Sequence, residues 1–217
     1  MQRLTKSRLQ DHFRYNAWKY ALIIALSVLV WDFIYLQTAY RPPEDKRIDW
    51  YVQSPGSSAE ELDAYLAPIW QASVPEMEQV ASVMLMPSGG NDYYADMQLS
   101  TYLMAGQGDV YLLPRDLFKR YAAQGVFSPL EGYVAAGRLR LDGLDAAAGE
   151  VTYVETEANG APTVSERHLY GIPAAALSRL NEAGIAPDNL VIAVSAASGN
   201  EDNIITFLDA FIAASRE

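Results

Sequence analysis

Residues 101–134 read TYLMAGQGDVYLLPRDLFKRYAAQGVFSPLEGYV, and this stretch decides the fold class that the sequence predicts. A helix is expected to end at Gly106, because glycine readily adopts the left-handed conformation that closes helices. Residues 109–113 form a short apolar run between turn residues, which is typical of a buried strand. Pro114 is expected as the first residue of a second helix, which ends at Gly125. A buried strand between two helices is the unit of a parallel sheet covered by helices, so the stretch predicts an α/β fold.

The rest of the chain continues this alternation of strands and helices. We expect further strands at 48–52, 79–86 and 189–194, and helices at 58–70, 93–105, 174–183 and 200–212. Residues 151–157 alternate with period two, and Asn159-Gly160 favours a tight turn, so residues 162–172 are expected to return antiparallel. The pattern predicts a three-layer architecture, a sheet with helices on both faces.

Four short strings carry a resemblance to a known family. They are AGQGDVY at 105–111, YAAQGVF at 121–127, PLEGYV at 129–134 and RHLYGIP at 167–173. Together they resemble the extracellular solute-binding proteins of ABC importers, of the sugar-binding type, with Gly108 standing where that family usually has proline. The resemblance covers roughly residues 48 to 173. It implies a periplasmic-binding-protein fold, a sugar ligand and an ABC permease as partner.

The resemblance also implies that only one lobe of that fold is present. Members of the family have two lobes and are much longer. This chain reaches residues 170–173, where the family enters its second lobe, and only about forty residues follow. These suffice to complete one lobe and are too few to build another. A single lobe offers an open half-site, whereas two closing lobes bury most of a ligand.

Composition excludes several classes of function. The chain has 217 residues, a formal net charge of −11 and no cysteine. An acidic protein lacks the basic surface that nucleic-acid binding needs, so no nucleic-acid partner is expected. Without cysteine and with only His12 and His168, the sequence builds neither familiar zinc sites nor catalytic triads. We therefore expect no catalytic residues, no metal and no cofactor, and we expect a structural role for His168.

Residues 17–36, AWKYALIIALSVLVWDFIYL, are the most hydrophobic stretch. Twenty helical residues at ~1.5 Å each span ~30 Å, the thickness of the hydrocarbon core of a bilayer. Basic residues precede the stretch, and aromatic residues lie at both of its ends, as interfacial residues do. We expect a cytoplasmic N-terminus at 1–16, a transmembrane anchor at 17–37, a proline-stiffened linker at 38–47 and an extracytoplasmic α/β domain at 48–217, on a bacterial cell membrane.

Two other interpretations of the apolar stretch stay open. The uninterrupted apolar run at 21–31 is short enough for a signal peptide, although no small-x-small cleavage pattern follows it. The third interpretation is a buried core helix, but the asymmetric charges that flank the stretch argue against it. Asp32 near the end of the stretch would cost a few kcal/mol at mid-bilayer and less near the interface. It would either snorkel to headgroup water or pair with a partner helix.

A ligand site is expected beyond the carboxyl ends of the parallel strands, where open α/β sheets bind ligands. The candidate ligand-binding residues are Gln53, Ser54, Ser88, Asn91, Asp92, Tyr93 and Tyr94. The two tyrosines would stack on a sugar ring or merely cover a helix start. Asn91 and Asp92 would cap that helix or, with Asp96, hold a cation. Ser88 to Gly90 would form an anion cradle before the helix, or a plain loop.

These observations lead to one expected function and one alternative. We expect a membrane-anchored, extracytoplasmic binding or docking module, non-catalytic, that resembles one lobe of a solute-binding protein. The alternative is a scaffold or protein-interaction subunit of a membrane complex that has lost solute binding. Exposed tyrosine- and methionine-rich patches would then contact protein.

Overall fold

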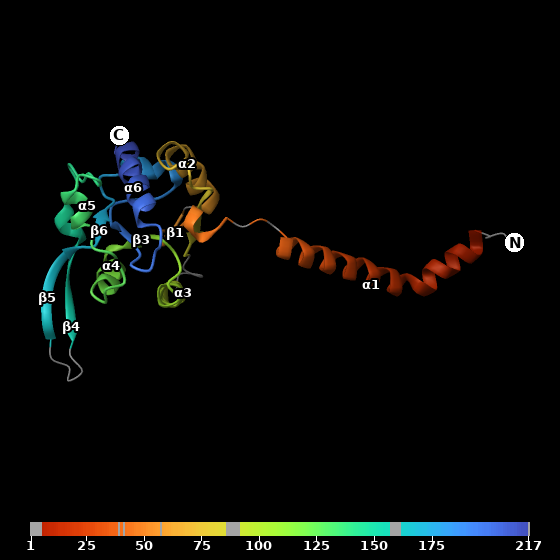
Figure 1. Ribbon diagram of the computed structural model, residues 1–217. Coiled ribbons are helices and arrows are strands. Elements are labelled where there is room, and N and C mark those ends of the chain that lie inside the picture. Colours follow the sequence, from red (N-terminus) through yellow and green to blue (C-terminus); the bar gives the residue numbers. More distant parts are fainter. Residues whose placement is uncertain are drawn as a thin grey trace. The chain divides into compact units, whose positions relative to one another are not determined.

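The computed structural model describes residues 6–38, 40, 42–56, 58–85, 92–156 and 162–216. The chain divides into two compact units, residues 1–41 and residues 42–217. The described part of the first unit is one helix, α1 (Lys6–Thr38), and the second unit is an α/β domain (Figure 1).

The α/β unit contains fifteen elements in the described residues. In chain order these are η1 (Glu44–Lys46), β1 (Arg47–Val52), α2 (Ala59–Ser73), β2 (Gln79–Met84), α3 (Asp92–Met104), β3 (Val110–Pro114), α4 (Arg115–Ala122), α5 (Glu131–Ala135), η2 (Ala146–Gly149), β4 (Glu150–Thr156), β5 (Pro162–Leu169), β6 (Gly171–Pro173), η3 (Ser178–Ala183), β7 (Leu190–Val194) and α6 (Glu201–Ser215).

The main sheet has five strands in the order β2-β1-β3-β7-β6. Strand β1 pairs parallel with both β2 and β3, as the helix–strand alternation predicts. Strand β7 pairs antiparallel with β3 and with β6, so the sheet is mixed, a feature that the sequence did not predict. No α-helix lies between β6 and β7 to carry the chain back across the sheet, as parallel neighbours require.

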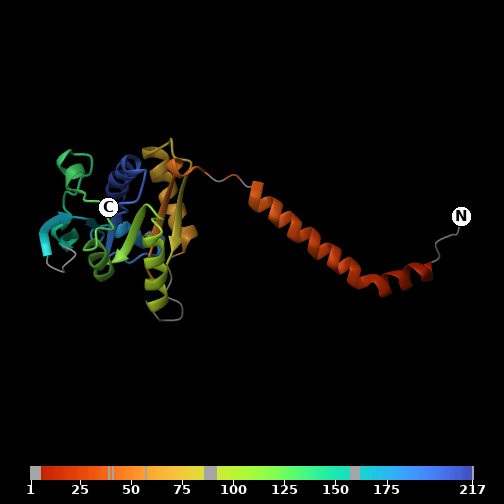
Figure 2. The ribbon, with the colours of Figure 1, turned by 60° about the horizontal axis from the view of Figure 1, so that its bottom comes forward.

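Both faces of the sheet are buried, which confirms the three-layer fold. On β1, Trp50 points into a core cluster with residues of α2 and α6, and its neighbour Tyr51 points into a second cluster with residues of α3 and α4. Residues of β3 alternate in the same way, as successive strand residues must. Figures 1 and 2 show the sheet between these two pairs of helices.

A separate two-stranded ribbon is formed by β4 and β5 (Figure 1). The strands pair antiparallel with Val151 opposite His168, which confirms the expected hairpin. The expected Asn159-Gly160 turn lies outside the described residues. Residues 171–173 do not continue the hairpin but join the main sheet as β6, so the ribbon is attached directly to a sheet strand.

Several expected helix boundaries need correction. Pro114 is the last residue of β3 and precedes α4, which begins at Arg115. Within 174–183 the structure has only the short 3-10 helix η3, because the Ala174 N–H donates to Leu190 O (2.9 Å) and prolongs strand pairing beyond β6. Helix α5 was not expected. The Ser58 hydroxyl accepts the Glu61 N–H (3.2 Å) and so caps the start of α2.

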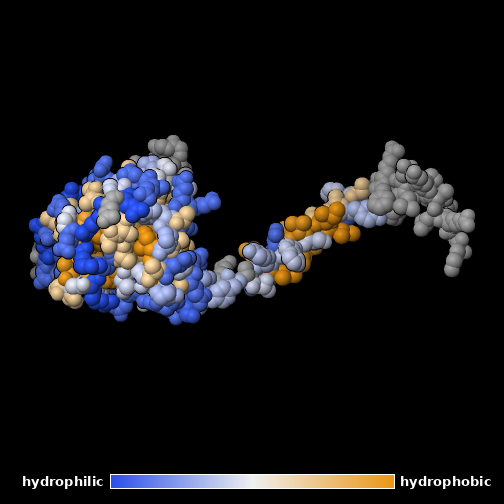
Figure 3. All heavy atoms as spheres, turned by 90° about the horizontal axis from the view of Figure 1, so that it is seen from above, coloured by the Kyte–Doolittle hydropathy of each residue, from blue (hydrophilic) through white to orange (hydrophobic). Residues whose placement is uncertain are grey.

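Helix α1 exposes its apolar side chains instead of burying them. Within it, Asn16–Thr38 is long and apolar enough to cross a membrane. The side chains of Trp18, Leu29 and Trp31 are 76%, 67% and 71% exposed. Hydrophobic atoms gather along α1 in Figure 3, whereas hydrophilic residues prevail on the visible surface of the α/β unit.

Candidate functional site

The predicted ligand residues after β1 lie at the carboxyl edge of the sheet but are buried. Gln53 and Ser54 are only 7% and 3% exposed. The Gln53 backbone N–H donates to Leu112 O (2.9 Å), which continues the β1–β3 pairing by one residue. Among the described residues, the Gln53 Oε1 atom has no hydrogen-bond partner, and neither has the buried Nε of Arg115, which follows β3. Gln53 and Arg115 therefore place buried polar atoms near this edge of the sheet.

The other predicted ligand residues surround the start of α3. Tyr93 and Tyr94 are 66% and 54% exposed, and their rings meet edge-on with centroids 5.9 Å apart. Asp92 is the first residue of α3, while Ser88 and Asn91 lie outside the described residues. A sugar-stacking role for the tyrosines and the proposed loop sites therefore stay predictions.

A large pocket lies at the opposite, amino edge of the sheet. Its volume is about 700 Å³. It is lined by residues of η1 and β1 (Glu44, Asp45, Arg47, Asp49, Tyr51), of the loop before β3 (Ala105, Gly106, Gln107, Gly108, Asp109) and of the loop before α6 (Ala197, Ser198, Gly199, Asn200). The expectation drew attention only to carboxyl ends, so it missed this pocket. One signal was present: Asp49 and Asp109 each stand at the start of an apolar run.

Asp109 joins three segments around this pocket. Its backbone N–H donates to Asp49 O (2.9 Å), and the Asp49 N–H donates to Asp109 Oδ2 (2.8 Å). The Ser198 hydroxyl donates to the other carboxylate oxygen, Oδ1, at 2.5 Å. Hydrogen bonds to a charged group are worth about 1.5–3 kcal/mol each. The network therefore holds the starts of β1 and β3 against the loop that leads into α6.

Asn200 adds a second link in the same wall. Its side-chain amide donates to Glu44 O (2.6 Å) and to Arg47 O (3.0 Å). Asn200 is the N-cap residue of α6, and its backbone O accepts the Ile204 N–H (3.0 Å), but its side chain makes no capping hydrogen bond. Polar residues before a helix often cap it, and only the folded arrangement shows which acceptor or donor wins.

The pocket is negatively charged. Glu44, Asp45, Asp49 and Asp109 face one arginine, Arg47, which forms an ion pair with Asp49 at 3.0 Å. Burial raises the pKa of Asp49, Arg47 opposes this rise, and the nearby Asp109 adds to it. A pocket of this charge disfavours anions and suits neutral or cationic groups. No group of three His, Cys, Asp or Glu side chains among the described residues could hold a metal ion.

Gly108 shapes the loop at the pocket. Its φ is +84°, and a Cβ there would lie 2.5 Å from the ring of Tyr51. Proline, with φ near −65°, could not adopt this conformation. The departure from the family pattern at this position therefore has a structural consequence: the loop passes directly against the tyrosines of the second core cluster.

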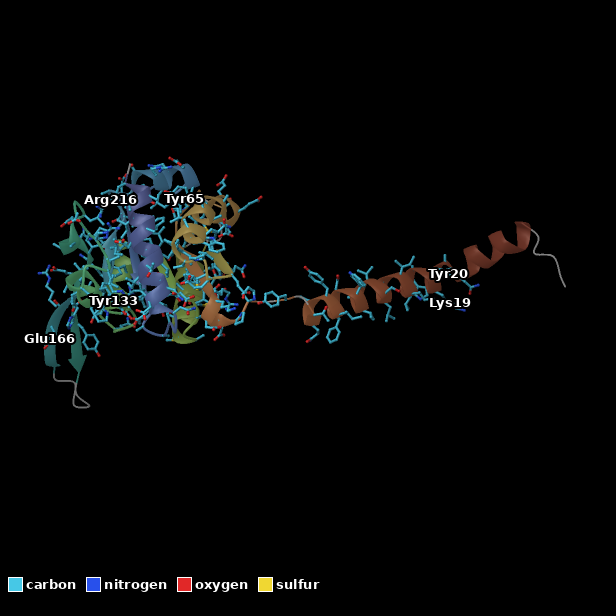
Figure 4. All side chains as sticks on the ribbon, turned by 45° about the horizontal axis from the view of Figure 1, so that its top comes forward. Lys19, Tyr20, Tyr65, Tyr133, Glu166 and Arg216 are labelled. Carbon is cyan, nitrogen blue, oxygen red and sulfur yellow. The ribbon has the colours of Figure 1, made fainter. Side chains whose placement is uncertain are left out.

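His168 joins the ribbon to α5 and lies outside the pocket. Its Nδ1 forms a hydrogen bond with the Glu131 carboxylate, and Nε2 lies 3.3 Å from Glu166 Oε2. Glu166 projects from β5, as Figure 4 shows. The bond to Glu131 raises the pKa of His168 above its ordinary value of 6.5. These contacts are those of a structural tie between β5 and α5.

Comparison with solved structures found similar chains, among them the following two. One is an extracellular solute-binding protein family 1 from Alicyclobacillus acidocaldarius (16% identity, TM-score 0.40, covering 65% of this chain and 34% of that chain). The other is an ABC substrate-binding protein from Listeria monocytogenes in complex with cycloalternan (20% identity, TM-score 0.40, 58% of this chain and 28% of that chain). This chain thus spans about a third of their length. Similarity at this level says nothing about the ligand or partner of this chain.

No family model matches the chain, and no curated protein matches it either.

Proposed function

We propose that this chain is a membrane-anchored, extracytoplasmic, non-catalytic module that binds a small polar solute, in the manner of one lobe of a solute-binding protein. The observation that carries the proposal is α1, an apolar helix whose large side chains are exposed, followed by an α/β unit with a filled core. A helix that is apolar on all sides needs lipid or protein around it. An ABC permease or another membrane protein would be the partner.

The anchoring part is tested by cysteine labelling, because the natural chain contains no cysteine. Single variants Ser7→Cys and Gln71→Cys place a thiol in the first turn of α1, ahead of the apolar span Asn16–Thr38, and on the exposed surface of α2. In intact spheroplasts, a membrane-impermeant maleimide should label Gln71→Cys at once and Ser7→Cys only after permeabilisation. A cleaved signal peptide would instead release a shortened protein that fractionates away from the membrane. Equal labelling of both variants would contradict the proposed topology.

The binding part concerns the carboxyl edge. Two buried polar atoms that lack a partner among the described residues, Gln53 Oε1 and Arg115 Nε, lie near this edge, and the exposed Tyr93 and Tyr94 lie in the first turn of the helix after β2. Sugars are bound by such combinations of aromatic faces and fixed polar groups. A thermal-shift screen of the full chain in nanodiscs with oligosaccharides should give a reproducible rise in Tm. The double variant Tyr93→Ala, Tyr94→Ala should lose it, while Met104→Ala at the far end of α3 should keep it.

One observation favours a second candidate function, that of a scaffold. The exposed face of α3 carries Met97 (50% exposed) and Met104 (89% exposed) in addition to the two tyrosines. Tyrosine and methionine are enriched in protein interfaces. If sugars leave Tm unchanged, and crosslinking from Met104→Cys captures the same membrane protein that binds the wild-type chain, the scaffold explains the module better.

A further inference from the structure

In the proposed anchoring, with the span Asn16–Thr38 centred in the bilayer, Asp32 lies too deep to reach water by itself. The span Asn16–Thr38 has its midpoint at residue 27, and Asp32 is five residues beyond it, ~8 Å along the helix. The half-thickness of the hydrocarbon core is ~15 Å, so a centred span leaves Asp32 ~7 Å inside the boundary. The short aspartate side chain does not cover this distance. Snorkelling to headgroup water therefore does not account for Asp32.

Lys19 provides the contrast. It lies eight residues before the midpoint, ~12 Å along the helix, and so only ~3 Å inside the opposite boundary. Its long apolar stem lets the ammonium group reach the interface. Figure 4 labels Lys19 and Tyr20 near this end of the span. Of the two charges in Asn16–Thr38, only Asp32 needs a protein partner.

Three small residues lie on the same side of α1 as Asp32. Ala17, Ala21 and Ala25 precede it at spacings of four, four and seven residues, which an α-helix brings to one side. All are exposed. Small side chains let a second helix approach closely in lipid, and a charged residue on such a side normally pairs with another protein group.

We propose that this side of α1, defined by Ala17, Ala21, Ala25 and Asp32, binds a transmembrane helix of a different protein that carries Lys or Arg at the depth of Asp32. The inference rests on the proposed membrane anchoring. Charge complementarity selects the occupant: a second copy of α1 would bring two carboxylates together without a countercharge. A basic side chain both satisfies the carboxylate and fixes the depth of the partner helix.

The test measures energy transfer in lipid vesicles. The full chain carries a donor fluorophore on Ser7→Cys. The probe is a synthetic Leu/Ala transmembrane helix with an acceptor fluorophore at the end that lies on the same side of the membrane as Ser7→Cys, and with Lys at the depth of Asp32. The matched probe has Leu in place of Lys. Binding of the Lys probe should be roughly fivefold stronger than that of the Leu probe. Asp32→Asn should abolish the difference, and Ala21→Leu should weaken binding of the Lys probe.

Two further variants make the outcome decisive. Ser27→Leu fills a hollow on a different side of α1, lined by Ile23, Leu26, Val30 and Trp31 among others, and should leave binding unchanged. Asp32→Lys should reverse the preference, binding a probe that carries Asp. Equal binding of both probes, or stronger transfer between copies of the chain than to the Lys probe, would overturn the proposal. If α1 does not insert, the impermeant maleimide should label Ser7→Cys and Gln71→Cys equally. That result would instead refute the anchoring.

Discussion

Helices α1 and α6 are both rich in apolar residues, yet they use them in opposite ways. In α6 the apolar positions form a stripe, and Ile204, Phe207 and Phe211 are fully buried against the sheet. In α1 they surround the helix, and Leu29 and Phe33 remain 67% and 64% exposed. A striped helix needs a core on one side only, whereas a helix that is apolar all round needs an apolar solvent. The arrangement of apolar residues, more than their number, determines which surroundings each helix requires.

The largest expected effect sharpens this contrast. The Phe211 ring packs against Trp50 (centroids 5.0 Å apart), so Phe211→Ala should leave a cavity and destabilise the α/β unit by about 3–5 kcal/mol. Phe33→Ala on α1 should change the stability of that unit by less than about 0.5 kcal/mol. Denaturant unfolding of the full chain in nanodiscs, followed by circular dichroism, measures both. Similar losses for the two variants would break the comparison.

An introduced arginine should impair membrane insertion when it is placed in α1 but not when it is placed on α6. Leu26→Arg places a charge near the middle of the apolar span and should disfavour insertion by about 2.5–3.5 kcal/mol. The same residue introduced at the exposed surface of α6, as Thr206→Arg, should leave membrane association unchanged. Carbonate extraction of membranes reports the inserted fraction of each variant. Full retention of Leu26→Arg would show that α1 does not contact hydrocarbon at this depth.

The polar network before α6 should have an intermediate effect. Asp109→Ala leaves the Asp49 N–H and the Ser198 hydroxyl without their acceptor, and should destabilise the unit by about 1–3 kcal/mol. At the opposite sheet edge, Gln53→Met removes an oxygen that already lacks a partner among the described residues, and should be close to neutral. The comparison of their urea midpoints tests whether α6 depends on this network as well as on its apolar stripe.

The smallest expected effect depends on pH. The hydrogen bond with Glu131 raises the pKa of His168 above 6.5, so its stabilisation is complete below pH 6.5 and disappears as the pH rises through the folded value. For Glu131, burial raises the pKa, but the hydrogen bonds from His168 and from the backbone, together with the charge of His168, outweigh burial and the net pKa falls below 4.5. Its contribution therefore disappears only as the pH falls through that lowered value.

The His168 tie is largely solvent-exposed and should stabilise the α/β unit by less than about 1 kcal/mol. Between pH 6 and pH 8 the wild-type chain should lose slightly more stability than His168→Gln, as followed by urea unfolding at each pH. Insertion of α1 should not change over this range. Identical pH profiles of the two proteins would mean that the ion pair contributes nothing to stability.

Most elements of the fold followed from local patterns. The apolar stripes of α2 and α6, the apolar runs of β1 and β3, and the alternation in β4 are all periodicities that a single segment displays. Their positions were predicted to within a few residues. The candidate site was predicted less well. Gln53 and Ser54 are at the expected edge but buried, and the pocket of about 700 Å³ lies at the other edge.

The features that the sequence did not predict share one cause: each depends on a partner that is distant in the chain. The direction of β7 depends on which strands it joins. The side-chain amide of Asn200 donates to the backbone of Glu44 and Arg47, more than 150 positions earlier in the chain. His168 pairs with Glu131 on α5. Each of these residues has a plausible local role as well. Residue spacing within one segment suggests such local roles, but it does not reveal which distant acceptor or strand the residue binds in the folded chain.

By itself, the sequence determined the α/β class, the three-layer arrangement and the apolar character of α1, because periodicity and composition act within one segment. Only the tertiary structure decided that β7 runs antiparallel, that Asp109 ties two strands to the loop before α6, and that a polar pocket forms at the amino edge. These features depend on hydrogen bonds between residues that become neighbours only when the chain is folded.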